Sequence, residues 1–183
     1  TCGGNVTSAS GLTGVRTEPP GGFTPVAVRD ENNLIGLNAA GTAAIGNGTY
    51  GVFVGDSPQH VIGSPGGGRN VISGNLETGV ELRGAAATAI TVAANYIGTD
   101  ITGTIAIPNL AVQGGIFLNN APVNFIGGAN AGNVVSGNTN HGITVVGAGS
   151  TGNRIEGNLV GLAADGLTAL ANGGIGIDIV SAG

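Results

Sequence analysis

The sequence predicts an all-β chain that folds as a right-handed, three-sheet parallel β-helix, a solenoid of about six turns with open ends. Three observations predict this fold. Two interleaved motifs recur with one period, short apolar runs recur in the same order within each turn, and asparagine marks the same corner of every turn. The period is the strongest of the three, because self-similarity at a fixed spacing is the signature of a repeat architecture.

The two motifs define the repeat. The first begins at Asn5, Asn70 and Asn133 as NVTSASGLTGVR, NVISGNLETGVE and NVVSGNTNHGIT, 65 and 63 residues apart. The second begins at Asn33, Asn95 and Asn158 as NLIGLNAAGTAA, NYIGTDITGTIA and NLVGLAADGLTA, 62 and 63 residues apart. We therefore expect one domain over residues 1–183, made of three repeats of about 63 residues with two turns each.

Each turn contains three strand-like runs, bounded by Gly, Asn and Ser turn signals. Gly-led runs begin near Val15, Val52, Val80, Ile116, Ile143 and Ile175. Second runs lie at Val26, Val61, Ile90, Phe125 and Ile155, and the third runs follow the six asparagines. In the Gly-led run GVELRG, alternation places Val80 and Leu82 inside and Glu81 and Arg83 outside. The inward column Val52, Val80, Ile116, Ile143 and Ile175 is then entirely aliphatic.

Other architectures fit less well. No segment keeps the 3.6-residue period of an amphipathic helix, so helical crossovers between strands are not expected. The turns repeat head to tail, whereas hairpins would relate neighbours by a mirror pattern. Charged residues make up 8 % of the chain, and aliphatic residues are abundant, which excludes the composition of a disordered chain.

The six asparagines have a structural explanation. The sharp corner before the third strand favours a left-handed residue, which Gly and Asn tolerate best. Stacked Asn side chains can also hydrogen-bond to their counterparts in adjacent turns, as in other ladders of stacked strands. We therefore assign Asn5, Asn33, Asn70, Asn95, Asn133 and Asn158 to a structural ladder. The NGT sequence at Asn47 lies in a predicted loop and is a glycosylation candidate in a eukaryotic secreted setting.

Strings such as RNVISGN, NYIGTDITGT and NRIEGNLVG resemble the right-handed parallel β-helix repeat proteins of the pectin-lyase-like superfamily. The resemblance covers essentially the whole chain and is specific for the fold. That superfamily includes lyases, hydrolases, epimerases, phage tailspikes and adhesins, so the resemblance does not select one activity.

A candidate ligand surface lies on the outer face of the first sheet, formed by the Gly-led runs. Long loops follow Gly36, Gly98 and Gly161 and must leave the same edge of the solenoid, which in repeat proteins is often the binding face. The resemblance also implies a groove along this sheet. One outward column reads Arg16, Phe53, Glu81, Phe117, Thr144 and Gly176, and the next reads Gly55, Arg83, Asn119, Val146 and Asp178. We select Phe53, Glu81, Arg83, Phe117, Asn119 and Asp178 as the possible ligand surface, because outward Phe rings flanked by polar groups suit a sugar ring or a partner protein.

The same surface lacks the groups that catalysis requires. Glycoside hydrolysis needs two carboxyl groups about 5 to 9.5 Å apart. Glu81 and Asp178 lie three turns apart, about 14 Å at the strand spacing of a sheet. The resemblance implies an acidic pair, a His-Gly motif and an Arg-x-Lys sequence in polygalacturonase-like enzymes. His141-Gly142 imitates one part of this set, and the chain contains no Lys.

We therefore expect a secreted or cell-surface structural or binding β-solenoid of bacterial type without catalytic activity. The alternative is a carbohydrate-active enzyme, a polysaccharide lyase or glycoside hydrolase of the pectin-lyase-like type. No cofactor is expected. No metal site is expected either, since His60 and His141 lie in different connections, and Asp100 and Asp165 occupy different positions of equivalent loops.

The expected partner is a polysaccharide or a surface protein. A net charge of −5 without basic clusters argues against nucleic acid, and no apolar run is long enough to span a membrane. The sequence begins at a third run and stops after a first run, so both ends would expose strand edges. This predicts a piece of a longer array, or homo-oligomers that form through the ends. Cys2 has no second cysteine in the chain to pair with.

Overall fold

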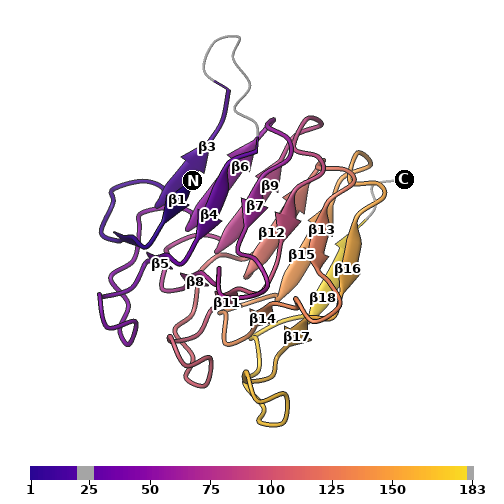
Figure 1. Ribbon diagram of the computed structural model, residues 1–183. Helices are drawn as coiled ribbons and strands as arrows, with labels where there is room; N and C mark the ends of the chain where they lie inside the picture. Colours follow the sequence, from indigo (N-terminus) through magenta and orange to yellow (C-terminus); the bar gives the residue numbers. More distant parts are fainter. Residues whose placement is uncertain (20–26, 181–183) are drawn as a thin grey trace.

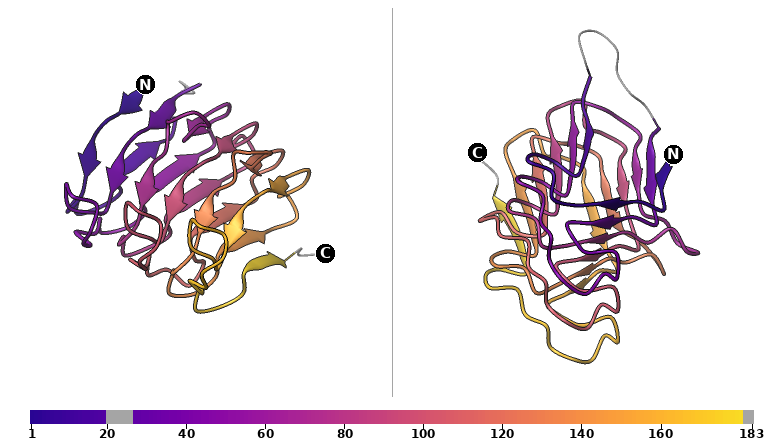
Figure 2. Two further views of the ribbon diagram at one scale, coloured as in Figure 1. Left: turned by 60° about the horizontal axis from the view of Figure 1, so that its bottom comes forward. Right: turned by 90° about the vertical axis from the view of Figure 1, so that its left-hand side faces the viewer.

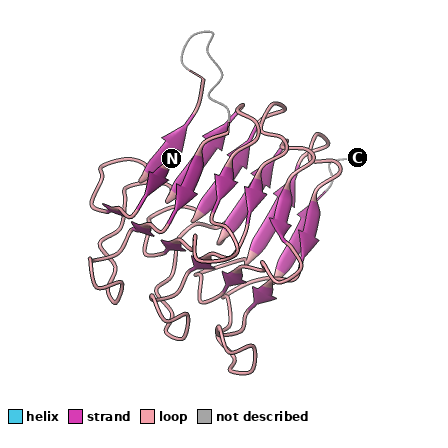
Figure 3. Cartoon of the chain, viewed as in Figure 1, coloured by secondary structure: helices cyan, strands magenta, loops and turns pink. Residues whose placement is uncertain are grey.

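The strands form three parallel sheets of six strands each, stacked along one solenoid. The computed structural model describes residues 1–19 and 27–180, and none of these residues lies in a helix. Figures 1 and 3 show the strands of each sheet running in the same direction, side by side from one terminus to the other. The predicted fold class, a right-handed three-sheet parallel β-helix, is confirmed.

Each coil of the solenoid contributes one strand to each sheet. Sheet A contains β1 (Cys2–Gly3), β4 (Arg29–Glu31), β7 (Val61–Ile62), β10 (Thr91–Val92), β13 (Phe125–Gly127) and β16 (Arg154–Glu156). Sheet B contains β2 (Val6–Thr7), β5 (Leu34–Ile35), β8 (Val71–Ile72), β11 (Tyr96–Ile97), β14 (Val134–Val135) and β17 (Leu159–Val160). Sheet C contains β3 (Val15–Thr17), β6 (Val52–Gly55), β9 (Val80–Arg83), β12 (Ile116–Asn119), β15 (Ile143–Val146) and β18 (Ile177–Val180). Sheet C is the first sheet of the sequence analysis.

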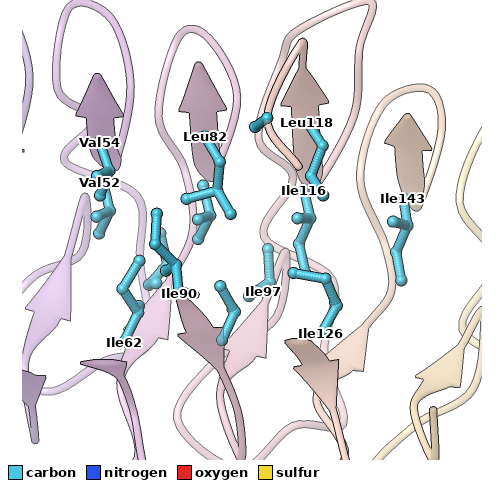
Figure 4. Packing of buried hydrophobic residues seen from close by; sticks show 14 of the residues in the cluster. Val52, Val54, Ile62, Leu82, Ile90, Ile97, Ile116, Leu118, Ile126 and Ile143 are labelled. Atoms are coloured by element: carbon cyan, nitrogen blue, oxygen red, sulfur yellow. The ribbon is translucent and has the colours of Figure 1, made fainter. Parts of the chain in front are cut away.

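Stacked aliphatic side chains fill the space between the sheets. Figure 4 shows Ile62 and Ile126 of sheet A facing Val52, Leu82 and Ile116 of sheet C across the interior. These side chains are fully or almost fully buried. The right view of Figure 2, seen from the N-terminal end of the solenoid, shows the three sheets around this interior. Because most inward positions of successive coils are aliphatic, burial of apolar area is repeated from coil to coil.

The predicted asparagine ladder is confirmed at the corner between sheets A and B. Nδ2 of each ladder residue donates to Oδ1 of the next, at 3.1, 3.0, 3.0, 3.0 and 2.9 Å from Asn5 to Asn158. Each Oδ1 after the first also accepts the backbone N–H of the preceding ladder residue, as between Asn70 and Asn95 at 3.1 Å. In four of the six coils a left-handed residue stands directly before the ladder residue, as at Asn32 with φ of 59° and Ala94 with φ of 61°, and no ladder asparagine is itself left-handed. The asparagines are therefore selected for their hydrogen bonds and not for their backbone conformation.

A second asparagine ladder, which the sequence analysis missed, runs along the corner between sheets B and C. Asn47, Asn75, Asn109, Asn138 and Asn172 are linked from Nδ2 to Oδ1 at 2.8, 2.9, 3.0 and 3.0 Å. Asn47 has no exposed surface and also donates to the carbonyl of Thr7 at 3.1 Å. The expectation that Asn47 is a glycosylation candidate is therefore wrong, because its amide is buried and bonded.

The sequence placed some strands in the wrong register. Ile177 pairs with Ile143, so β18 begins two residues later than the expected strand at Ile175. The cause is the duplicated Gly-Ile dipeptide at 174–177, and the hydrogen bond from the Gly142 N–H to the carbonyl of Ile175, 3.0 Å, selects the second copy.

The second runs need smaller corrections. The strand near Ile90 is Thr91–Val92, and Ile155 occupies the middle of Arg154–Glu156. The run at Val26 lies outside the described residues. The described chain also opens with β1, whose Cys2 pairs with Asp30, rather than at the third run.

The three long loops leave the same side of the solenoid, as predicted, after β5, β11 and β17 (Figure 1). Each is closed by an isolated antiparallel bridge: Leu37 with Ala44, Thr99 with Ala106, and Leu162 with Ala169. The loops also contact one another, since the Ile101 N–H donates to the carbonyl of Gly41 and the Ala164 N–H to that of Gly103, both at 2.9 Å. The loops thus form a stack of their own beside the coils.

The core has one charged member that the sequence analysis did not single out. Asp30 follows Cys2 and precedes Ile62 in the inward column of sheet A, and it is 1 % exposed. Neither of its carboxylate oxygens has a hydrogen-bond partner. Burial raises the pKa of Asp30 to about 6, because an ionised carboxylate without partners is unfavourable in an apolar interior.

Candidate functional site

The outer face of sheet C was the predicted ligand surface, and strand pairing fixes its columns. The first column reads Arg16, Phe53, Glu81, Phe117, Thr144 and Asp178. Asp178 thus stands in the column where the sequence placed Gly176, because of the register shift in β18. The second column contains Gly55, Arg83, Asn119 and Val146, as expected.

The predicted Phe rings point outward but are not exposed. Phe53 is 5 % exposed, Phe117 8 % and Glu81 1 %. The connections that precede the strands cover this column: the Tyr50 ring lies 5.2 Å from the Phe53 ring, and Thr144 Oγ1 donates to the Gln113 carbonyl at 2.8 Å. The expectation of solvent-facing Phe rings is therefore wrong, and a ligand would meet the groups around them instead.

Those groups form a cluster at β3, β6 and β9. The guanidinium carbons of Arg16 and Arg83 lie 5.6 and 5.3 Å from the centre of the Phe53 ring. Arg83 also lies 5.9 Å from the centre of the Tyr50 ring and donates to its hydroxyl at 3.2 Å. We call Arg16, Tyr50, Phe53 and Arg83 the aromatic–arginine cluster. Together with Thr13 and Glu18 it lines a surface hollow.

Two glutamates balance the charge of this cluster. Arg16 pairs with Glu18, and Arg83 pairs with Glu81 on its own strand. Burial raises the pKa of Glu81, against the opposing effect of the neighbouring Arg83 charge. Both arginines keep about half of their side-chain surface exposed, at 57 and 47 %. The cluster therefore offers a half-exposed Tyr50 ring and two partly free guanidinium groups, with little net charge.

The structure brings together only part of the predicted surface. Phe53, Glu81 and Arg83 belong to or contact the cluster, and Phe117 and Asn119 lie on the adjacent strand β12. Asn119 is half-buried, and its Oδ1 accepts a hydrogen bond from the Asn120 side chain at 3.1 Å. Asp178 is three strands from Glu81, about 14 Å at the spacing of neighbouring strands.

Tyr50 and Glu18 are the members that sequence reasoning missed. Tyr50 is one of only two Tyr residues and stands directly before the Gly-led run of β6. An aromatic residue at that position, next to an outward Phe, was the available signal. Glu18 follows Arg16 with the same spacing that separates Glu81 from Arg83, which is the distance between outward neighbours on one strand.

The described residues contain no group of three or more His, Cys, Asp or Glu side chains that could hold a metal ion. Asp100 Oδ1 accepts from the N–H groups of Thr104 and Ile105 at 3.0 Å, and Asp165 Oδ1 accepts from Leu167 and Thr168 at 2.8 Å. Hydrogen bonds lower the pKa of Asp165, and those to Thr102, Thr104 and Ile105 outweigh burial to lower that of Asp100. Asp100 and Asp165 therefore each hold the turn of the loop that contains them, by accepting its backbone N–H groups.

His60 has a structural role at the corner between sheets C and A. Its Nδ1 accepts the Val28 N–H at 3.1 Å, and its Nε2 lies 2.6 Å from Ser57 Oγ. Asn124 and Asn153 occupy the corresponding positions in later coils, where their Oδ1 atoms accept N–H groups of the preceding coil. Burial lowers the pKa of His60, so the ring stays neutral in this position.

The chain matches no protein-family model, no curated protein and no solved structure in the comparisons made with each. In the described part of the chain, no helix has the length and apolar character needed to cross a bilayer.

Proposed function

We propose that the chain is a secreted or cell-surface β-solenoid of the pectin-lyase-like type that serves as a structural and binding module without catalytic activity. The observation that supports the binding role is the aromatic–arginine cluster, where a half-exposed Tyr50 ring lies beside the buried Phe53, with the Arg83 guanidinium near both rings and the Arg16 guanidinium near Phe53. Aromatic faces pack against the C–H face of sugar rings, and guanidinium groups donate to hydroxyl or carbonyl oxygens. We propose polysaccharide as the ligand, with a surface protein as the other candidate.

The carboxylates of sheet C support a non-catalytic role. A glycosidase needs a second carboxyl group within about 9.5 Å of the first. Glu81 is 1 % exposed and paired with Arg83, and Asp178 of the same column is three strands away. The nearby Glu77, whose charge also raises the pKa of Glu81, lies in the connection before β9 and not on the sheet. A raised pKa is a property of general acids, but Glu81 is covered by the groups that a substrate would touch.

The test is binding to a polysaccharide panel, with Tyr50→Ala as the variant. We expect the affinity for the bound glycan to fall by about fivefold, because one aromatic stacking contact contributes about 1 kcal/mol. Tyr96→Ala is the matched control: Tyr96 also stacks with an arginine, Arg69 at 4.0 Å, but lies on sheet B. The control should bind as the unchanged chain does.

Two results would overturn the proposal. Equal binding by Tyr50→Ala and Tyr96→Ala would remove the cluster from the binding role. Degradation of a polysaccharide by the unchanged chain, lost in Glu81→Gln while circular dichroism shows an intact fold, would establish the carbohydrate-active enzyme instead.

A further inference from the structure

Four of the five arginines of this chain are paired with a glutamate two residues away along the same strand or its continuation. Residues separated by two positions lie on the same face of a strand, so this spacing brings each pair into contact. The fifth, Arg69, lies over the Tyr96 ring. The four pairs are Arg16–Glu18, Arg29–Glu31, Glu81–Arg83 and Arg154–Glu156.

Two of these pairs belong to the aromatic–arginine cluster, and they leave little free positive charge for an anionic ligand. Arg16 Nε donates to Glu18 Oε2 at 2.9 Å, and Glu18 lines the hollow with 41 % of its side chain exposed. An anion that approaches Arg16 therefore also meets the Glu18 carboxylate. Arg83 is paired with the buried Glu81, whose charge would lose its partner if a ligand took the guanidinium away.

A third carboxylate makes this surface negative. Glu77 is exposed in the connection before β9, and it lies close enough to Glu81 for its charge to raise the pKa of that carboxyl. Three carboxylates thus accompany two guanidinium groups, on a chain whose net charge is −5. An acidic polymer would meet repulsion both at the hollow and from the chain as a whole.

The same groups suit the hydroxyl groups of an uncharged sugar. A hydroxyl both donates and accepts, so sugar hydroxyls can accept from Arg16 and Arg83 and donate to Glu18 without separating either ion pair. Thr13 and Tyr50 add two further hydroxyl groups to the lining of the hollow. The buried carboxylate beside the hollow then keeps its partner, so binding does not carry the energetic cost of an unpaired buried charge.

We propose that the aromatic–arginine cluster binds an uncharged polysaccharide, and that Glu18 is a specificity residue that excludes acidic ones. The inference rests on the proposed function, because it names the chemical class of the polysaccharide bound at the same site. Specificity is a difference between two affinities, and an unfavourable contact with the wrong ligand increases that difference. Glu18 supplies this contact, since it is exposed whereas Glu81 is buried.

The test uses polysaccharides in matched pairs that differ in their carboxylates. Mannan, pullulan and β-1,3-glucan are compared with their C6-carboxylated forms, and polygalacturonate and alginate with their carboxyl-reduced forms, by affinity electrophoresis of the full chain. For every pair that binds, we expect the uncharged member to bind at least about tenfold more tightly at low ionic strength. Added salt should narrow this difference, because it screens the repulsion between exposed charges.

Glu18→Gln is the variant that tests the exclusion. It removes the exposed carboxylate and leaves the Arg16 guanidinium unpaired, so the affinity for the acidic members should rise by about fivefold. Glu156→Gln is the matched control, because it removes the same charge from the equivalent pair with Arg154 on sheet A. The control should bind the acidic members as the unchanged chain does, and circular dichroism should show that both variants are folded.

The outcomes separate this inference from the proposed function. If no polysaccharide binds, or if Tyr50→Ala binds as the unchanged chain does, the proposed function fails and this inference fails with it. If the acidic members bind as tightly as the uncharged ones, only this inference fails and the cluster keeps its binding role. The same holds if Glu18→Gln increases binding of the acidic members no more than Glu156→Gln does.

Discussion

Replacing Asn95 by alanine is expected to lower the free energy of unfolding by about 3 to 5 kcal/mol. The Asn95 side chain is fully buried and makes four hydrogen bonds. It donates to the Ile62 carbonyl at 2.8 Å and to Asn133 Oδ1 at 3.0 Å, and it accepts from the N–H and Nδ2 of Asn70 at 3.1 and 3.0 Å. Alanine leaves these partners unpaired in a site without solvent, and each buried unpaired group costs about 1 to 3 kcal/mol.

Chemical denaturation followed by circular dichroism measures this loss. Asn5→Ala is the matched control, since Asn5 is exposed and starts the same ladder. Asn5→Ala should lower the free energy of unfolding by less than about 1 kcal/mol, because water can replace the lost hydrogen bonds at this exposed position. Asn109→Ala extends the test to the second ladder, where the side chain donates to the carbonyl of Ile72 and to Asn138 at 3.0 Å. If Asn95→Ala lowers the free energy of unfolding no more than Asn5→Ala does, the ladder does not stabilise the fold.

Replacing Asp30 by valine is expected to raise the free energy of unfolding at pH 7 by about 3 kcal/mol. The pKa of Asp30 in the folded chain is about 6, against 3.8 for the free side chain. One pKa unit corresponds to about 1.4 kcal/mol, so keeping the buried carboxylate ionised at pH 7 destabilises the fold by this amount. Valine continues the aliphatic column that begins at Ile62.

The pH dependence gives the sign of the effect. Between the unfolded and folded pKa values, the folded state binds more protons than the unfolded state, so lowering the pH stabilises the fold. The loss of unfolding free energy caused by the ionised Asp30 carboxylate is complete above about pH 6 and disappears below about pH 4. The stability difference between Asp30→Val and the unchanged chain should therefore be largest at pH 7 and should shrink as the pH falls to 4.

Denaturation midpoints at several pH values between 4 and 8 test this difference. The comparison must be between variant and unchanged chain, because Asp100 has a lowered pKa and gives a pH dependence of the opposite sign. Glu77→Gln, an exposed carboxylate, is the control and should change stability by less than about 0.5 kcal/mol. A difference that stays constant with pH would show that Asp30 does not titrate in this range.

The fold could be predicted because its causes are local and repeated. The asparagines at one corner and the alternating apolar runs appear in the sequence with constant order, so the sheets, the first ladder and the long loops followed. The second ladder was missed because Asn47, Asn109 and Asn172 follow long loops whereas Asn75 and Asn138 follow short ones, so their spacing is irregular. The register of β18 was misplaced because two identical dipeptides satisfied the same pattern.

The candidate site was harder to predict, because it depends on what covers the strands. Alternation gave the outward direction of Phe53, Glu81 and Phe117 correctly. Alternation contains no information about the connections that fold over these side chains, so it predicts neither their burial nor the contact with Tyr50. The inward position of Asp30 was hidden by the charged neighbours Arg29 and Glu31, which make the whole string resemble a solvated turn.

The stacking of the long loops limits how the length of this protein can change during evolution. The Ile101 N–H donates to the Gly41 carbonyl and the Ala164 N–H to the Gly103 carbonyl, so each loop is hydrogen-bonded to a loop two coils away. Loss or gain of a single coil would place a short connection where a loop needs its neighbour. Duplication or deletion of a whole two-coil module keeps every loop beside another loop, and the chain is therefore expected to grow or shrink in units of one full sequence repeat.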